Sequence, residues 1–136
     1  MNNKNTKANP EFITLESAAA MKTGTRITFV PGVQAMYAEA LKNICYVKKI
    51  KVIRVLHPLM GTEKETGEDR QKRLYELTSQ TSLPIMLHDE QRPRNVWIEQ
   101  LALAEEIGAK DTPKLIPRDF KQRMEVIGLC ALTLAE

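Results

Sequence analysis

Residues 26–56 read RITFVPGVQAMYAEALKNICYVKKIKVIRVL, and this stretch decides the fold class. Its first part, Arg26–Val30, is rich in β-branched and aromatic residues, which indicates a strand that ends at the turn Pro31-Gly32. Apolar residues then recur at helical spacing over Val33–Tyr46. The stretch Ile50–Leu56 is alternately apolar and basic at first and then nearly all apolar, which suits a buried strand. A strand, a helix and a strand within about thirty residues predict a βαβ unit with parallel strands and a right-handed connection.

Turn signals and apolar segments alternate along the rest of the chain. The predicted elements are, in order, a helix capped by Glu68 or Asp69 and ending near Thr78, a strand over Leu83–His88, a very short returning strand over Pro93–Asn95, a helix over Val96–Ile107 closed by Gly108, and a last helix capped by Asp119. Trp97 is interpreted as the core anchor of its helix. The whole order predicts an α/β fold, a βαβ-α-ββα domain with an extra C-terminal helix.

The length of 136 residues suits one domain of ordinary size. Residues 1–24 hold few periodic apolar positions, so we expect a flexible N-terminal extension with at most a short helical turn near Leu15–Met21. The folded domain is expected over residues 25–110. Residues 111–136 are expected to form a linker and one further helix.

Composition excludes several classes of protein. The formal net charge of +3 is spread along the chain, which argues against a nucleic-acid partner. No apolar run approaches the roughly 20 residues that span a bilayer, and the polar N-terminus lacks the apolar segment of a secretory signal. Cys45 and Cys130 cannot form a disulfide scaffold and are read as buried thiols, and His57 and His88, read as loop or strand-end residues, are not spaced as metal ligands. We therefore expect a soluble cytoplasmic domain with no metal and no membrane partner.

The third predicted strand opens with Leu83-Pro84-Ile85-Met86-Leu87, and with this string the chain resembles the N-terminal thioredoxin-like domain of glutathione S-transferases. The resemblance covers roughly residues 26–134. The strings that carry it, in chain order, are Ile27–Gly32 with Ala38–Lys42, Val47–Ile50, Thr81–Met86, Pro93-Arg94 with Trp97 and Leu103–Glu105, and Leu115–Pro117 with Asp119 and Arg123. The last of these resembles the start of the family's helical second domain.

The resemblance implies a glutathione site around Leu83. In the family, the residue before a cis proline offers its backbone N–H and C=O to the cysteinyl part of glutathione, as an added strand would. That residue is Leu83 here, and the resemblance implies a cis bond to Pro84, whereas the residues alone leave cis and trans open. The start of the next helix, here Asn95 and Val96, is expected to receive the γ-glutamyl carboxylate on its N–H groups. The family usually has a Glu/Gln-Ser pair at this point, and Val96 lacks the hydroxyl.

In the family, the glutathione sulfur points at the start of the first helix, where a Tyr, Ser or Cys promotes formation of the thiolate. This chain has no Ser or Cys between Pro31 and Met36. Gln34 and Tyr37 are the polar side chains nearby, so Gln34 is a candidate glutathione contact and Tyr37 the candidate catalytic residue. No Cys-x-x-Cys motif occurs, which excludes dithiol exchange.

The resemblance implies a transferase that binds glutathione as a substrate and, in complete homologues, adds its thiolate to an electrophile of unknown identity. The alternative is a non-catalytic thioredoxin-fold module that binds a peptide or a partner protein through the same edge, so enzyme activity stays open. The last helix carries an apolar stripe that would be exposed unless the helix folds back on the domain or finds a partner. We therefore expect the helix to belong to a truncated helical domain or to form a homodimer. The residues of this stripe are Phe120, Met124, Ile127, Ala131 and Leu134.

Overall fold

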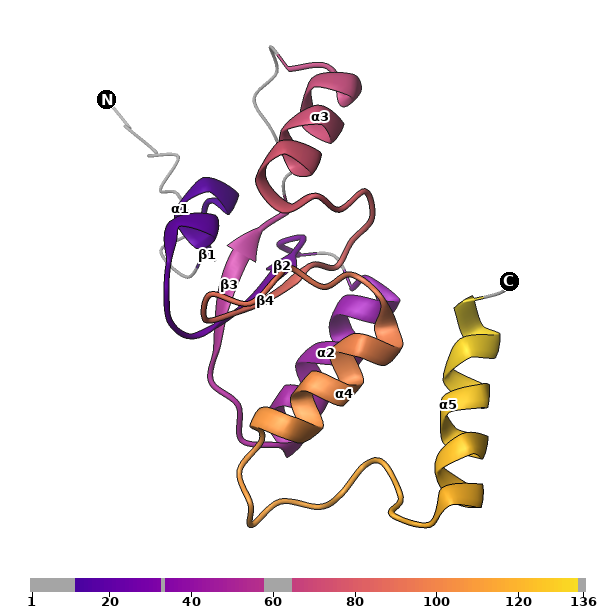
Figure 1. Ribbon diagram of the computed structural model, residues 1–136. Coiled ribbons are helices and arrows are strands. Elements are labelled where there is room, and N and C mark those ends of the chain that lie inside the picture. The colour runs from indigo at the N-terminus through magenta and orange to yellow at the C-terminus, as the bar shows by residue number, and fades with distance from the viewer. Residues whose placement is uncertain (1–11, 33, 58–64, 135–136) are drawn as a thin grey trace.

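The structure of the protein is a computed structural model that describes residues 12–32, 34–57 and 65–134. This part of the chain forms an α/β fold in which helices cover both faces of a four-stranded sheet (Figure 1). The α/β class expected from the sequence is confirmed. In chain order the elements are β1 (Phe12–Ile13), α1 (Leu15–Ala20), β2 (Thr25–Phe29), α2 (Met36–Val47), β3 (Val52–Leu56), α3 (Gly67–Thr78), β4 (Met86–His88), α4 (Trp97–Ile107) and α5 (Phe120–Leu134).

The strands of the sheet lie in the order β1-β3-β2-β4. Strands β2 and β3 are parallel, with Ile27 opposite Arg54, and β1 is parallel to β3 on its other side. The predicted parallel pairing within the βαβ unit is therefore confirmed. Strand β4 runs antiparallel to β2. The expected returning strand is reduced to a single bridge between Met86 and Arg94.

Two apolar clusters fill the space between the sheet and its helices. On one face, α2 and α4 lie side by side against the sheet, and on the other lie α1 and α3 (Figure 1). Successive strand residues point to opposite faces, so Met86 joins the first cluster while Ile85 and Leu87 join the second. Fully or nearly fully buried members of the first cluster include Ile27, Leu41, Cys45 and Leu103, and those of the second include Leu15, Ala18, Val55 and Leu74.

The interpretation of residues 1–24 as an extension outside the fold is wrong for residues 12–20. These residues form β1 and α1, and Leu15 and Ala18 are buried in the core. The side chain of Thr14 caps α1 by accepting a hydrogen bond from the backbone N–H of Ser17 (3.1 Å). A strand of two residues and a helix of six are too short to produce a periodic pattern. The short helical turn expected near Leu15–Met21 is confirmed.

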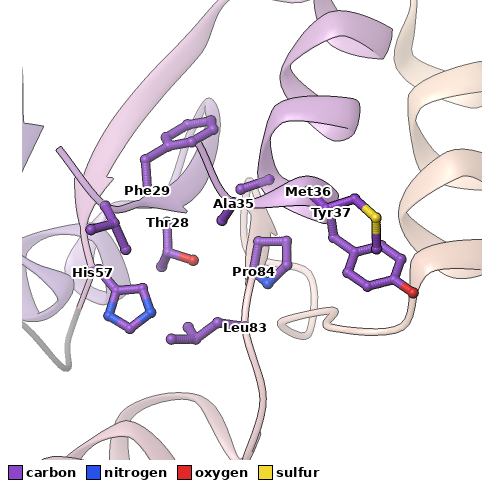
Figure 2. A pocket seen from close by; sticks show the side chains of 10 residues that line it. Thr28, Phe29, Ala35, Met36, Tyr37, His57, Leu83 and Pro84 are labelled. Carbon is purple, nitrogen blue, oxygen red and sulfur yellow. The ribbon is translucent and has the colours of Figure 1, made fainter. Parts of the chain in front are cut away.

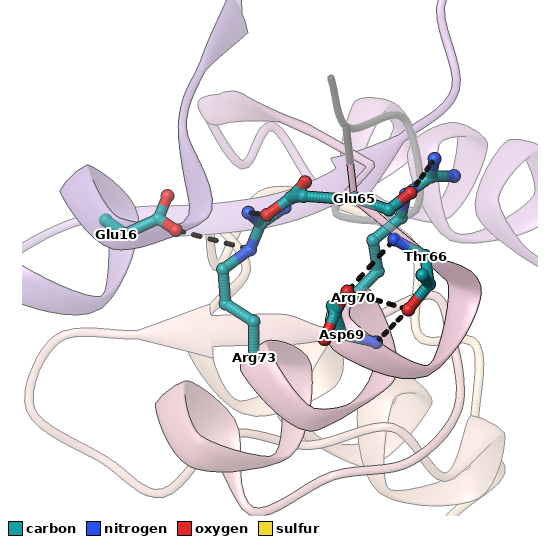
Figure 3. Close-up of polar contacts among 6 residues, drawn as sticks. All are labelled: Glu16, Glu65, Thr66, Asp69, Arg70 and Arg73. Atoms are coloured by element: carbon teal, nitrogen blue, oxygen red, sulfur yellow. Dashed lines mark hydrogen bonds and ion pairs between the residues drawn. The ribbon is translucent and has the colours of Figure 1, made fainter. Parts of the chain in front are cut away.

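The N-cap of α3 is Thr66, two or three residues before the predicted caps Glu68 and Asp69. Thr66 Oγ1 accepts from the backbone N–H of Asp69, whose carboxylate accepts in return from the Thr66 backbone N–H, both at 3.1 Å (Figure 3). Arg73, further along the helix, contacts the carboxylates of Glu65 and of Glu16 on α1 (Figure 3). These contacts fix the start of α3 against α1.

The last helix begins where the sequence predicts. Asp119 Oδ2 accepts from the backbone N–H of Gln122 at 3.0 Å, which confirms Asp119 as the cap. Helix α5 contacts α4 but leaves large apolar side chains exposed, among them Phe120, Leu129 and Leu132. None of the helices in the described ranges is long and apolar enough to cross a membrane.

Candidate functional site

A cavity of about 200 Å³ lies where the carboxyl ends of β2 and β3 meet the start of α2 and the segment before β4. We call it the Leu83 cavity (Figure 2). Ligand pockets commonly measure roughly 300–1,000 Å³, so this cavity suits one side chain of a ligand rather than a whole tripeptide. It is lined by Thr28, Phe29, Val30, Ala35, Met36, Tyr37, Ala38, His57, Leu83 and Pro84.

The Leu83-Pro84 segment forms one wall of the cavity, and the bond between the two residues is cis, as predicted. Thr28 on β2 holds the next residue with two hydrogen bonds. Its backbone N–H donates to the carbonyl of Ile85 (3.1 Å), and its Oγ1 accepts from the Ile85 backbone N–H (2.9 Å). The backbone N–H and C=O of Leu83 form no hydrogen bond with any residue that the structure describes. They are therefore available to an extended ligand at the mouth of the cavity.

Gln100 of α4 supports the same segment from behind. Its side chain is only 1% exposed, and its Nε2 donates to the carbonyls of Pro84 (2.9 Å) and Arg94 (3.1 Å). The amide thus joins the start of β4 to the bridge that follows it. Sequence reasoning missed Gln100, although an amide three residues after Trp97, within an apolar helix stripe, is a signal of a buried hydrogen-bonding role.

The start of α4 lies close to the Leu83 cavity but does not line it. Asn95 Nδ2 donates to Oγ of Ser82 at 2.5 Å, which brings Asn95 next to the residue that precedes Leu83. Val96 occupies the N-cap position and supplies no side-chain cap. Of the predicted ligand residues, the structure thus brings Leu83, Pro84, Asn95 and Val96 to one end of the sheet.

The two candidates at the start of α2 are placed differently. Gln34 is exposed and does not line the cavity. Tyr37 lines it with part of its ring and packs on Trp97, with ring centroids 6.1 Å apart. Figure 2 shows the Tyr37 hydroxyl pointing away from Leu83 and His57.

His57, directly after β3, also lines the Leu83 cavity. Its backbone N–H donates to the carbonyl of Phe29 at 2.8 Å, which continues the pairing of β2 and β3. The imidazole lies beside the Leu83 side chain (Figure 2). Burial lowers the pKa of His57, so the neutral ring predominates at pH 7. The interpretation of His57 as a strand-end residue is correct, but the sequence analysis did not place it in a cavity. Its position was a signal for one, because α/β proteins bind their ligands at the carboxyl ends of parallel strands.

Neither of the two cysteines belongs to the described lining of the Leu83 cavity. Cys45 is fully buried, and burial raises the pKa of its thiol to about 11. Neither Cys45 nor Cys130 forms a disulfide, and Cys130 is half-buried rather than buried. Among residues 12–32, 34–57 and 65–134, no three His, Cys, Asp or Glu side chains are grouped as metal ligands would be.

No protein-family model and no curated protein matches the chain.

Proposed function

We propose that the chain has a thioredoxin-like fold and binds glutathione at the Leu83 cavity. The fold assignment is supported by the order of elements from β1 to α4 and by the sheet order β1-β3-β2-β4 with β4 antiparallel. It is also supported by the division of the helices, with α1 and α3 on one face and α2 and α4 on the other.

The observation that carries the binding proposal is the Leu83 main chain beside the cavity. Its N–H and C=O, unpaired within the described residues, can hold the cysteinyl backbone of glutathione as an added strand, and the thiol side chain then enters the cavity. The start of α4 lies next to this segment through the Asn95–Ser82 hydrogen bond. Its free N–H groups suit the γ-glutamyl carboxylate.

A thermal-shift titration tests the binding proposal. Glutathione at about one hundred times its dissociation constant adds about 2.7 kcal/mol to the unfolding free energy, which raises the melting temperature by on the order of 10 °C. Ophthalmate, in which a methyl group replaces the thiol, is expected to bind more weakly. Ala35→Trp fills the cavity mouth and should abolish the shift. Ala102→Trp, on an exposed position of α4 outside the cavity, is the matched control. No shift with the parent chain contradicts the proposal.

The second candidate is a non-catalytic module that binds a peptide through the same main-chain groups. It is favoured by the lack of a Ser or Cys from Pro31 to Met36 and by the Tyr37 hydroxyl, which points away from Leu83 (Figure 2). A conjugation assay with glutathione and a chlorinated dinitrobenzene separates the two candidates. Turnover supports a transferase, whereas glutathione binding without turnover supports the module.

We further propose that the exposed apolar side chains of α5 contact a second copy of the chain or a helical domain. Phe120 and Leu129 are 72% and 65% exposed, which is unusual for side chains of this size. Sedimentation analysis of the parent and of a Phe120→Ser, Leu129→Ser variant tests for the homodimer. A monomeric parent contradicts the homodimer.

A further inference from the structure

The Leu83 cavity has two titratable side chains in its described lining, and they lie on opposite sides of Pro84. Figure 2 shows the imidazole of His57 beside the Leu83 side chain, whereas Tyr37 lies beyond Pro84 with its hydroxyl directed away. None of the described residues of the lining carries a charged side chain. A group that enters the cavity beside Leu83 therefore meets the imidazole before it meets the phenol.

Thr28 is the third polar side chain of the described lining. Thr28 Oγ1 accepts from the Ile85 backbone N–H at 2.9 Å, and this bond holds the segment after Pro84 in place. A hydroxyl in this role cannot remove a proton from a ligand, because its own basicity is far too low. His57 is the one side chain of the described lining whose basicity matches proton transfer near neutral pH.

We propose that His57 is the proton acceptor for a thiol bound in the Leu83 cavity, an inference that rests on the proposed function. The sulfur–hydrogen bond of glutathione breaks, its proton moves to an imidazole nitrogen, and the electron pair stays on the sulfur. The resulting thiolate attacks the electrophilic carbon of a second substrate, a sulfur–carbon bond forms, and the leaving group departs with its bonding electrons. His57 then releases the proton to water.

The surroundings of His57 support this role. Burial lowers the pKa of His57 and so favours the neutral imidazole, the form of the ring that accepts a proton. Once the thiolate has formed, the imidazolium has an adjacent negative charge in an apolar cavity, where attraction between opposite charges is strong. The same attraction stabilises the thiolate and lowers the pKa of the bound thiol.

The ultraviolet absorbance of the thiolate tests the proposal. Glutathione is titrated with the parent chain, His57→Gln, His57→Asn and Tyr37→Phe, and the ionised fraction of the bound thiol is followed against pH. We expect the thiol pKa to rise by at least about one unit in both His57 variants, a tenfold smaller ionisation constant, while the dissociation constant of ophthalmate stays within about threefold. Tyr37→Phe should titrate like the parent.

Three other outcomes overturn the assignment in distinguishable ways. Absence of glutathione binding by the parent removes the proposed function and the role of His57 together. Binding with the same thiol pKa in the parent and both folded His57 variants removes only the role of His57. A raised thiol pKa in Tyr37→Phe alone assigns the proton transfer to Tyr37 instead. Circular dichroism and ophthalmate binding show which variants keep the native site.

Discussion

Nζ of Lys48 lies 2.8 Å from Oε1 of Glu105, and the Lys48 side chain is only 1% exposed. Lys48 also donates to the carbonyl of Pro113 at 2.9 Å, and Glu105 Oε2 accepts from the backbone N–H of Ile116 at 3.0 Å. Gly108 packs directly on the lysine, since a Cβ at this position would lie 2.5 Å from Lys48 Cε. The ion pair therefore connects the end of α2, helix α4 and the linker that leads to α5.

Replacing Lys48 should destabilise the fold strongly. Lys48→Met leaves the Glu105 carboxylate without its cation in a site shielded from water, and loss of one partner of a buried pair costs about 3–5 kcal/mol. Urea denaturation measures the change. The matched control is Lys49→Met, which breaks an exposed ion pair with Asp111 and should have no measurable effect. Equal stability losses in the two variants contradict a special role for Lys48.

The same pair predicts how stability depends on pH. Burial acts to raise the pKa of Glu105, but the contact with Lys48 and the backbone N–H groups of Ile116 and Leu115 outweigh it, so the pKa lies below its usual range. A carboxyl group with a lowered pKa stabilises the fold above its unfolded pKa, and this contribution is lost as the pH falls through the folded pKa. We expect the unfolding free energy to decrease below about pH 4.5 and to decrease less steeply in Glu105→Gln. If the unfolding free energies of the parent and of Glu105→Gln fall equally steeply as the pH is lowered, this expectation is contradicted.

Gln100→Leu should destabilise the wall of the Leu83 cavity. The substitution keeps the size of the side chain roughly constant but leaves the carbonyls of Pro84 and Arg94 without their shared donor. The Arg94 carbonyl still accepts from the backbone N–H of Met86 at 2.8 Å, so only the Pro84 carbonyl is left without a donor among the described residues. One buried unsatisfied group costs about 1–3 kcal/mol, and we expect a loss of this size in denaturant unfolding. Gln91→Leu makes the same replacement of an amide side chain by an alkyl side chain at an exposed position, so it is the matched control. If Gln100→Leu leaves the free energy of unfolding unchanged, water molecules take over the hydrogen bonds of the amide and the expectation is contradicted.

The two cysteines should react very differently with a maleimide. Cys45 is fully buried and its pKa is about 11, so its reactive thiolate is nearly absent at pH 7. Cys130 on α5 is partly exposed. Mass spectrometry should find one modified cysteine in the native chain and two in denaturant. Cys130→Ser should remove the native modification, and Cys45→Ser should leave it. Rapid native labelling of Cys45 contradicts its placement in the core.

Periodicity in the sequence was sufficient to predict the elements around the sheet centre. Arg26–Val30 and Ile50–Leu56 match β2 and β3 within two residues, because both stretches are rich in β-branched residues and are bounded by turn signals. The pairing of β1 could not be predicted in this way, since Phe12 and Ile13 are too few to show a period. Boundaries set by caps, such as Thr66 at α3, depend on side-chain hydrogen bonds that several neighbouring residues could have made.

Buried polar side chains were the main feature that the sequence did not reveal. Arg26 lies in β2 and is 1% exposed because its guanidinium donates to several backbone carbonyls, including those of Gly24 (2.6 Å) and Asp89 (3.1 Å). Lys48 is buried by an acceptor 65 residues away. A pattern of neighbouring residues cannot indicate partners at such separations. For the candidate site, the sequence and the resemblance located Leu83 and Pro84. His57 lines the cavity because the parallel register of β2 and β3 places Leu56, the residue before it, opposite Phe29.

Strand β1 and helix α1 also decide where the chain can be shortened. A chain that begins at Met21 loses the residues that pair with Arg54 and Val55 on β3. The outer side of β3 then presents unpaired backbone groups to solvent, which is the template on which foreign strands add and from which aggregates grow. The same deletion removes Leu15 from the apolar cluster that contains Val55. Shortened versions should therefore keep Phe12 to remain monodisperse at high concentration.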